Sequence, residues 1–239
     1  MLSSNWLSAL VPATGGSDWL STNSSDPMGL IAAKQNNSLA PYAQYAIAQA
    51  ATALSAGNNA QAITAFKKAA VLDPNNTTAF NYLGKIYLQQ GNTTEAIKAY
   101  KQLVRIQSDQ STVDTSSGAP TQEAATISLG NAFLQAKKYV ESEQQFKAAA
   151  RLAPRDPLPP YTLGQQYLTQ GRLGEALTQV QTAQKLSPKD GNVYYALGSI
   201  YNAQNNYLDA ATALQTSIQL KPNFPAANYQ LAIAYNGLG

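Results

Sequence analysis

Residues 157–224 read PLPPYTLGQQYLTQGRLGEALTQVQTAQKLSPKD and then GNVYYALGSIYNAQNNYLDAATALQTSIQLKPNF, two stretches that match position by position. Each carries Leu-Gly at the same place, a tyrosine three residues after that glycine, and a proline near its end. An earlier copy of the stretch ends near Pro154, and the three closing prolines Pro154, Pro188 and Pro222 are spaced by 34 residues. A fixed period of this length indicates a repeat architecture, in which each unit packs only on its neighbours.

The pattern extends toward the N-terminus. Leu-Gly pairs begin at Leu83, Leu129, Leu163 and Leu197, and the aromatic residues that follow them are Tyr87, Phe133, Tyr167 and Tyr201. A small residue recurs at Ala62, Ala96, Ser142, Ala176 and Ala210, and four places later comes Phe66, Tyr100, Phe146, Val180 or Leu214. The units therefore run over 43–76, 77–110, 123–156, 157–190 and 191–224.

Within each unit the apolar residues recur three and four apart, which is the period of an amphipathic helix. In the second unit Gln90-Gly91-Asn92 interrupts this period, so the unit reads as two helices joined by a turn. Glycine and alanine at fixed places let the two helices approach closely, and the aromatic residues fill the gaps beside them. We therefore interpret the repeated residues as core rather than as a functional site.

This pattern resembles the tetratricopeptide repeat family, whose 34-residue unit has Leu-Gly, then Tyr, Ala, Phe and a closing Pro. The resemblance implies an all-α fold, an α-solenoid of about five helix-turn-helix repeats plus an unfinished sixth at 225–239. Some positions depart from the family pattern. Ala50 and Ala53 replace the glycine and the aromatic residue of the first unit, Ser108 replaces a closing proline, and Lys137 and Asn205 replace the turn glycine of Gly57, Gly91 and Gly171.

The segments outside the repeats are rich in Ser, Thr, Asn and Gly. Residues 1–42 are expected to be mostly irregular, with a short helix near 27–36 that starts after Asp26-Pro27. Trp6 and Trp19 lie in this segment and are expected to dock on something, because apolar surface is costly in water. Residues 111–122 read as an exposed loop, either passive or a hinge between repeats 43–110 and repeats 123–224.

The composition argues against several functional classes. The chain has no cysteine and no histidine, and we find no catalytic set, phosphate-binding loop or metal-ligand spacing, so we predict no enzyme, no cofactor and no metal site. Charged residues make up 12%, and the net charge of +3 is too small and scattered for a nucleic-acid binder. No stretch is apolar enough to span a membrane, and the patch at 6–11 lacks the basic residues of a signal peptide.

In the tetratricopeptide repeat family the first helix of each unit lines a concave groove that receives a peptide. Carried over by position, this resemblance assigns the groove to Asn81, Lys85, Ile127, Asn131, Tyr161, Gln165, Tyr195, Ser199 and Tyr229. Tyr161, Tyr195 and Tyr229 are spaced by 34 residues and are expected to form a ladder. Tyrosine offers a large contact area and a hydroxyl, but these three could equally serve helix packing.

The best-known groove of the family clamps a C-terminal carboxylate with paired Lys and Asn residues. Here only Lys85 and Asn131 resemble that clamp, and they lie in different units, while Ile127, Tyr161 and Tyr195 stand where lysines would be needed. We therefore expect a protein or peptide partner with a neutral, partly apolar segment rather than an acidic tail. The chain's own segment with Trp6 and Trp19 could occupy the groove, in the same molecule or in another.

A second interpretation is a self-assembling subunit of an extracellular filament. The helix expected at 225–238 has no second helix to pair with and could pack on the beginning of another copy, unless the sequence stops early or the helix is a solvated cap. Candidate glycosylation sites are Asn23, Asn36, Asn75, Asn76 and Asn92. Low charge and many amide and hydroxyl groups slightly favour an extracellular or periplasmic location over a cytoplasmic one, and the compartment stays open.

Overall fold

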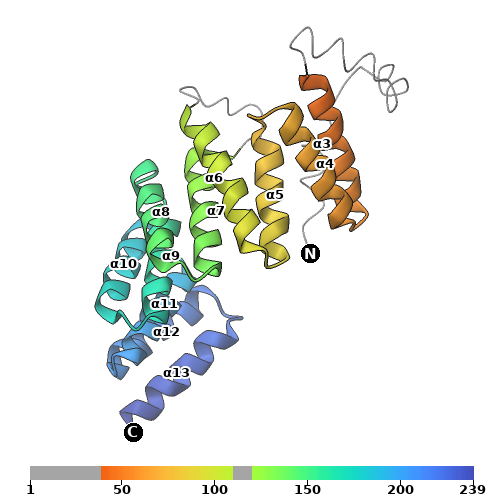
Figure 1. Ribbon diagram of the computed structural model, residues 1–239. Helices are drawn as coiled ribbons and strands as arrows, with labels where there is room; N and C mark the ends of the chain where they lie inside the picture. Colours follow the sequence, from red (N-terminus) through yellow and green to blue (C-terminus); the bar gives the residue numbers. More distant parts are fainter. Residues whose placement is uncertain (1–38, 110–119) are drawn as a thin grey trace. The chain divides into compact units, whose positions relative to one another are not determined.

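The computed structural model describes residues 39–109 and 120–239, and the regular elements within these ranges are eleven α-helices (Figure 1). The prediction of an all-α helical repeat fold is confirmed. The chain divides into two compact units, one up to Ala125 and one from Thr126 onward. The predicted helix near 27–36, the sites Asn23 and Asn36, and most of the loop at 111–122 lie outside the described residues.

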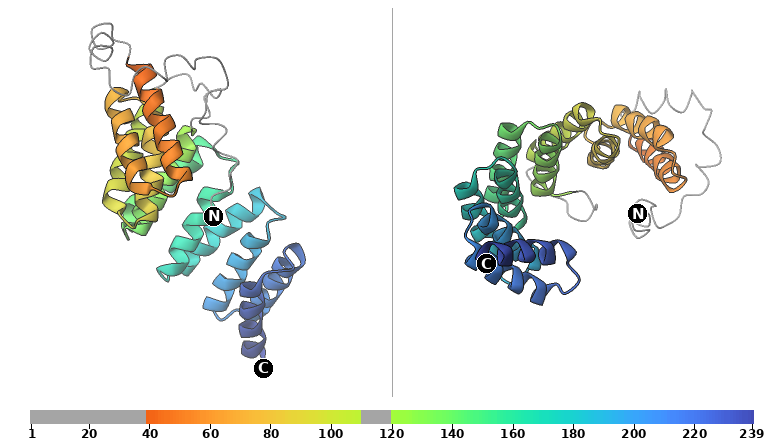
Figure 2. Two further views of the ribbon diagram at one scale, coloured as in Figure 1. Left: turned by 90° about the vertical axis from the view of Figure 1, so that its right-hand side faces the viewer. Right: turned by 90° about the horizontal axis from the view of Figure 1, so that it is seen from below.

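The first unit contains α3 (Ala40–Ser55), α4 (Asn59–Leu72), α5 (Thr77–Gln89) and α6 (Thr93–Asp109). Each of these helices packs against the next, and both views of Figure 2 show them as neighbours, from orange to yellow-green. The fully buried Phe66 ring of α4 stacks on Tyr82 of α5, with ring centroids 5.2 Å apart. The core of this unit is thus formed by the contacts between successive helices and has no single centre.

The second unit contains most of α7 (Gln122–Gln135), followed by α8 (Tyr139–Leu152), α9 (Leu158–Thr169), α10 (Leu173–Leu186), α11 (Gly191–Ala203), α12 (Tyr207–Leu220) and α13 (Pro225–Leu238). Neighbouring helices pack from α8 to α13, and α11 also contacts α9 and α13. The first helices of successive repeats, α9, α11 and α13, therefore lie side by side. Phe146, Leu163, Val180 and Ile200 are almost completely buried within one continuous core.

Left-handed backbone closes the turn between the two helices of a repeat. Gly57, Gly91 and Gly171 have φ angles of 71°, 74° and 72° at these turns. Lys137 and Asn205 stand at the equivalent positions and adopt φ angles of 57° and 59°. Left-handed backbone is unfavourable for a lysine, so the packing of the two flanking helices imposes the turn geometry even where glycine is absent.

Glycine inside the first helices marks the places where two helices come closest. A Cβ atom at Gly164 would lie 2.3 Å from Val180, and one at Gly198 would lie 2.4 Å from Leu214. These distances are far below van der Waals contact, so neither position has room for a methyl group. The structure supports the interpretation that the Leu-Gly glycine permits close approach of the paired helices.

Candidate functional site

The first helices of the second unit differ from the second helices in their charge. α9, α11 and α13 contain no Asp, Glu, Lys or Arg. The tyrosines expected to form a ladder lie one on each of these helices, and they differ in exposure. Tyr161 and Tyr195 are partly buried, whereas the side chain of Tyr229 is 70% exposed. This uncharged surface on α9, α11 and α13 is the candidate site.

Tyr161 forms an internal polar contact within this surface. The amide nitrogen of Gln165 donates a hydrogen bond to the Tyr161 hydroxyl over 2.8 Å. Burial raises the pKa of the Tyr161 hydroxyl, and the nearby Asp190 and Tyr195 raise it further. The hydroxyl therefore remains protonated at neutral pH, and part of the hydrogen-bonding capacity of Gln165 is already used inside the chain.

Tyr195 is held by residues that the repeat pattern did not single out. Its ring lies 4.8 Å from the ring of Phe224, at an interplanar angle of 47°. The ammonium of Lys221 lies 4.1 Å from the centre of the Phe224 ring and donates to Asn192 Oδ1 over 2.9 Å. Ser199, predicted to line the groove, donates to the backbone oxygen of Tyr195 over 2.9 Å. Phe224 and Lys221 thus hold one edge of the candidate site, at the entry to α13.

The remaining groove candidates are divided between the two units. Asn81 and Lys85 lie on α5 of the first unit, and Asn131 lies exposed on α7 of the second unit, where Ile127 is buried. The Lys85 side chain is exposed overall, but its ammonium lies 5.2 Å from the centre of the Tyr82 ring, and its partial desolvation lowers the pKa of Lys85. Lys85 and Asn131, the two residues that resemble a carboxylate clamp, therefore belong to different units.

The described glycosylation candidates differ in exposure. Asn76 is buried, its amide nitrogen donates to Asp73 over 3.1 Å, and its oxygen caps α5 by accepting from the backbone of Ala79 over 2.9 Å. Asn75 and Asn92 are exposed, and Asn92 accepts from the backbone of Glu95 at the start of α6. A glycan needs a free amide nitrogen at the surface, so Asn75 and Asn92 are better placed than Asn76 to carry one.

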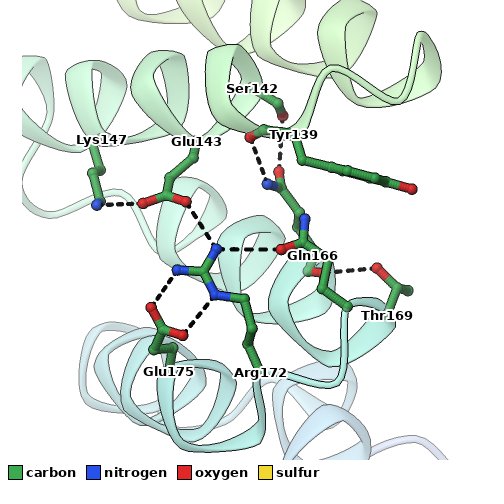
Figure 3. Close-up of polar contacts among 9 residues, drawn as sticks. Tyr139, Ser142, Glu143, Lys147, Gln166, Thr169, Arg172 and Glu175 are labelled. Carbon is green, nitrogen blue, oxygen red and sulfur yellow. Dashed lines mark hydrogen bonds and ion pairs between the residues drawn. The ribbon is translucent and has the colours of Figure 1, made fainter.

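Charged side chains gather on the second helices, as the network in Figure 3 shows. Glu143 of α8 accepts from Lys147 over 2.6 Å and from Arg172 over 3.2 Å. Arg172, just before α10, also pairs with Glu175, and its guanidinium lies 4.2 Å from the centre of the Tyr167 ring. This network joins two neighbouring repeats through partly exposed ion pairs, which contribute modestly to stability.

A buried polar contact lies beside the network (Figure 3). The Ser142 hydroxyl is fully buried and lies 2.9 Å from Gln166 Oε1 and 3.0 Å from the backbone oxygen of Gly130. The amide nitrogen of Gln166 donates to the backbone oxygen of Tyr139 over 2.9 Å. Because buried polar groups are costly without partners, these bonds favour the pairing of this particular α8 with this particular α9.

The sequence model of the tetratricopeptide repeat matches residues 47–111 and 161–238, which is more than half of the chain. The chain belongs to the tetratricopeptide repeat family. No curated protein gives a significant match to it.

Solved tetratricopeptide repeat structures share this fold. The crystal structure of MamA superposes with a TM-score of 0.63 at 22% identity, covering 75% of this chain and 92% of MamA. YrrB, described as a tetratricopeptide repeat protein with an unusual peptide-binding site, has a TM-score of 0.59 at 19% identity, covering 84% of this chain and 96% of its own. The C-terminal part of a tetratricopeptide repeat protein from Cytophaga hutchinsonii has a TM-score of 0.64 at 19% identity. The match covers 79% of this chain and 70% of that one. At these identities the likeness concerns the fold.

Within 39–109 and 120–239 no helix of this tetratricopeptide repeat chain is long and apolar enough to cross a membrane. Across the same residues, no group of three or more acidic side chains is arranged to hold a metal ion.

The ion-pair network predicts a pH dependence of stability for this tetratricopeptide repeat protein. Burial alone would raise the pKa of Glu143, but hydrogen bonds from Lys147, Tyr167 and Arg172 outweigh it and lower that pKa below its ordinary value of 4.5. The stabilisation by Glu143 is therefore complete above pH 4.5 and is lost as the pH falls through the lower, folded-state value. Because the pairs are partly exposed, we expect a loss below about 1 kcal/mol.

Thermal unfolding followed by circular dichroism between neutral and acidic pH checks this prediction. The Glu143→Gln variant lacks the titrating group and should show a shallower acid dependence than the parent chain. A matched Glu141→Gln variant, two residues away on the same helix and outside the network, should keep the parent dependence. Identical pH profiles for the parent and Glu143→Gln would contradict the assignment.

Proposed function

We propose that this protein is an interaction scaffold whose uncharged surface on α9, α11 and α13 binds a neutral, partly apolar polypeptide segment. The observation that carries the proposal is the absence of charge from three neighbouring first helices, while the second helices bear the ion pairs. The proposed role is binding without catalysis, since Glu143 and Glu175 are engaged by basic partners.

The side chains on this surface supply the interactions that an extended peptide needs. Tyr229 and the partly exposed ring of Tyr195 offer apolar area with little loss of rotamer freedom. Gln165 donates through its amide nitrogen to Tyr161, and its amide oxygen can still accept from a peptide N–H group. The three helices carry no charged side chain, and Lys221 at their edge is engaged by Phe224 and Asn192, so an acidic tail would lose hydration and gain little in return.

The peptide-binding description of YrrB supports a peptide as the class of ligand. The asparagine and lysine of the carboxylate clamp do not come together within either unit, so we propose recognition of an internal segment rather than of a free C-terminus.

Binding of synthetic peptides tests this proposal. The probes are uncharged peptides containing Tyr and Leu with amidated ends, and the same peptides ending in two aspartates and a free carboxylate. We expect the uncharged set to bind more tightly, with an affinity that changes little with salt because no charge contacts are formed. Fluorescence anisotropy at low and high salt measures the affinity of each peptide set and its dependence on salt. Preference for the acidic set, or a steep salt dependence, would count against the proposal.

Removing the Tyr195 ring should weaken this binding. Tyr195→Ala takes away partly exposed aromatic area at the middle of the uncharged surface, and we expect an affinity loss of about tenfold, or about 1.4 kcal/mol. Tyr139→Ala is the matched control, because Tyr139 is also partly exposed but lies at the start of the second helix α8. Equal affinities for the two variants would place the ligand elsewhere.

A second candidate function is self-assembly through α13. This helix exposes Tyr229, Ile233, Tyr235 and Leu238 and carries no charge, so a second copy could cover it. Light scattering over a range of concentrations distinguishes the candidates. A mass that grows with concentration, and returns to that of one chain in Ile233→Glu, supports assembly, and a constant monomer mass refutes it.

A further inference from the structure

A hollow of about 480 Å³ opens between α3 and α4, in the first unit and separate from the uncharged surface proposed for partner binding. Three alanines, Ala53, Ala56 and Ala65, contribute to its wall. Polar side chains line the rest, namely Gln49, Thr52, Gln61, Thr64 and Lys68. Its size lies within the range of roughly 300–1,000 Å³ that is typical of ligand pockets.

The hollow exists where the first repeat lacks an aromatic ring. Ala53 occupies the position that holds Tyr87, Phe133, Tyr167 and Tyr201 in the following repeats. Tyr87 and Tyr167 are buried there, at 7% and 3% exposure. The Tyr167 ring lies against Arg172, which shows that this position faces the turn and the start of the second helix of its own repeat. Ala53 is smaller than these residues by one aromatic ring, and it lines the hollow.

The surrounding face is not built to receive another repeat. In α5, which packs against the preceding helix α4, Leu83 and Ile86 are buried. The equivalent positions in α3 are Gln49 and Thr52, and both are exposed. A terminal repeat needs such a polar outer face for solubility. The hollow therefore suits a single aromatic side chain with a polar surround better than an apolar helix.

We propose that Trp19, carried by the segment of residues 1–38, fills this hollow in its own chain. That segment leads directly into α3, and it contains both tryptophans of the protein. Asp18 precedes Trp19 and complements Lys68 on the rim, whereas Trp6 is flanked by the uncharged Asn5 and Leu7. An aromatic side chain buries about 150–250 Å², which offsets part of the cost of ordering the segment.

The chain is long enough to place Trp19 there. The hollow begins about 14 Å along α3 from its first residue, at a rise of 1.5 Å per residue from Ala40 to Gln49. The twenty or so residues between Trp19 and Leu39 span roughly 25 Å as a flexible chain. Docking in the same molecule is favoured over docking on a second copy because the linker keeps the local concentration of Trp19 high. A docked segment would also not be free to enter the partner-binding surface of the second unit.

Tryptophan fluorescence of the full chain tests this inference, since Trp6 and Trp19 are its two tryptophans. In Trp6→Phe the signal comes from Trp19 alone, and we expect blue-shifted emission and weak quenching by acrylamide. In Trp19→Phe the remaining Trp6 should emit at longer wavelength and be quenched severalfold more strongly. A Trp19 signal as exposed as that of Trp6 overturns the proposal.

Filling the hollow with a ring from its own wall should release Trp19. In the Trp6→Phe background, Ala53→Tyr restores the ring found in the later repeats, and we expect the Trp19 emission to shift to that of an exposed indole. Ala60→Tyr, an exposed position of α4 outside the hollow, should leave the emission unchanged. Circular dichroism confirms that both variants are folded.

The rim charge gives an independent test. Lys68→Glu should increase the quenching of Trp19 because it opposes Asp18, whereas Lys67→Glu, next to it but outside the hollow, should have little effect. A shielded Trp19 that neither Ala53→Tyr nor Lys68→Glu exposes would place the segment elsewhere and refute the proposal. Protection of Trp19 from acrylamide that disappears on dilution would mean that Trp19 docks on a second copy, and would refute docking in the same chain.

Discussion

Replacing Phe146 with alanine is expected to lower the free energy of unfolding by about 3–5 kcal/mol. Phe146 is completely buried in α8, and its core neighbours include Leu163 of α9 and Val180 of α10. Its ring also lies under the backbone of Gly130 in α7. Alanine would remove most of these contacts and leave a cavity, because the helices on either side are held by their own neighbours and cannot close around it.

Urea denaturation followed by circular dichroism measures this loss, with Val140→Ala as the matched control. Val140 lies on the same helix but is 67% exposed, so its truncation should change stability by less than about 0.5 kcal/mol. Small domains are stable by about 5–15 kcal/mol, so the Phe146→Ala loss would be a large share of the total. A loss near that of Val140→Ala would show that α8 does not anchor the second unit.

The helical repeat fold could be predicted from the sequence because the same steric demand recurs in every unit. A small residue on one helix must face a large residue on its partner, as Gly198 faces Leu214. Such pairs recur at a fixed spacing in the sequence. The turns were harder to predict, because Lys137 and Asn205 lack the expected glycine yet keep its left-handed backbone. Asparagine tolerates this backbone, whereas at Lys137 the packing of the flanking helices outweighs local preference.

Contacts between repeats could not be predicted in this way. Ser142 fits the small-residue position of the repeat, where the other units have alanine. Its partner Gln166 lies 24 residues away, at a position that holds the apolar Ile86 in α5 and Ile200 in α11. The two polar residues, in different repeats, compensate each other only in three dimensions. The contact between the tilted rings of Phe224 and Tyr195 could not be predicted for the same reason.

The candidate site was predictable to the level of helix faces and no further. Periodicity assigned Tyr161, Tyr195 and Tyr229 to equivalent places on α9, α11 and α13, where the structure has them. Their exposure differs from partial to 70%, because the burial of each ring depends on which residues happen to follow in the next repeat. Their role in partner binding stays a prediction, as does the assignment of Asn81, Lys85 and Asn131.

The close approach at Gly164 leads to a further prediction with a large effect. Alanine is the better helix former by about 1 kcal/mol, so Gly164→Ala would stabilise an exposed helix. Here its Cβ would lie 2.3 Å from Val180 Cγ2 and 3.2 Å from the backbone oxygen of Ala176. Val180 is β-branched and keeps a single rotamer in a helix, so it cannot turn away, and the helices must separate. We expect a net loss of about 1–3 kcal/mol.

Two matched variants identify the cause of that loss in the same denaturation experiment. Gly174→Ala in α10 meets nothing within 4 Å and should be neutral or slightly stabilising. Val180→Ala removes the clashing methyl group, so the double variant Gly164→Ala/Val180→Ala should lose less stability than the sum of the two single variants. Strict additivity would mean that steric overlap with Val180 is not what requires glycine at this position. A loss smaller than the sum would show that the glycine of the repeat is retained for the closeness of its paired helices.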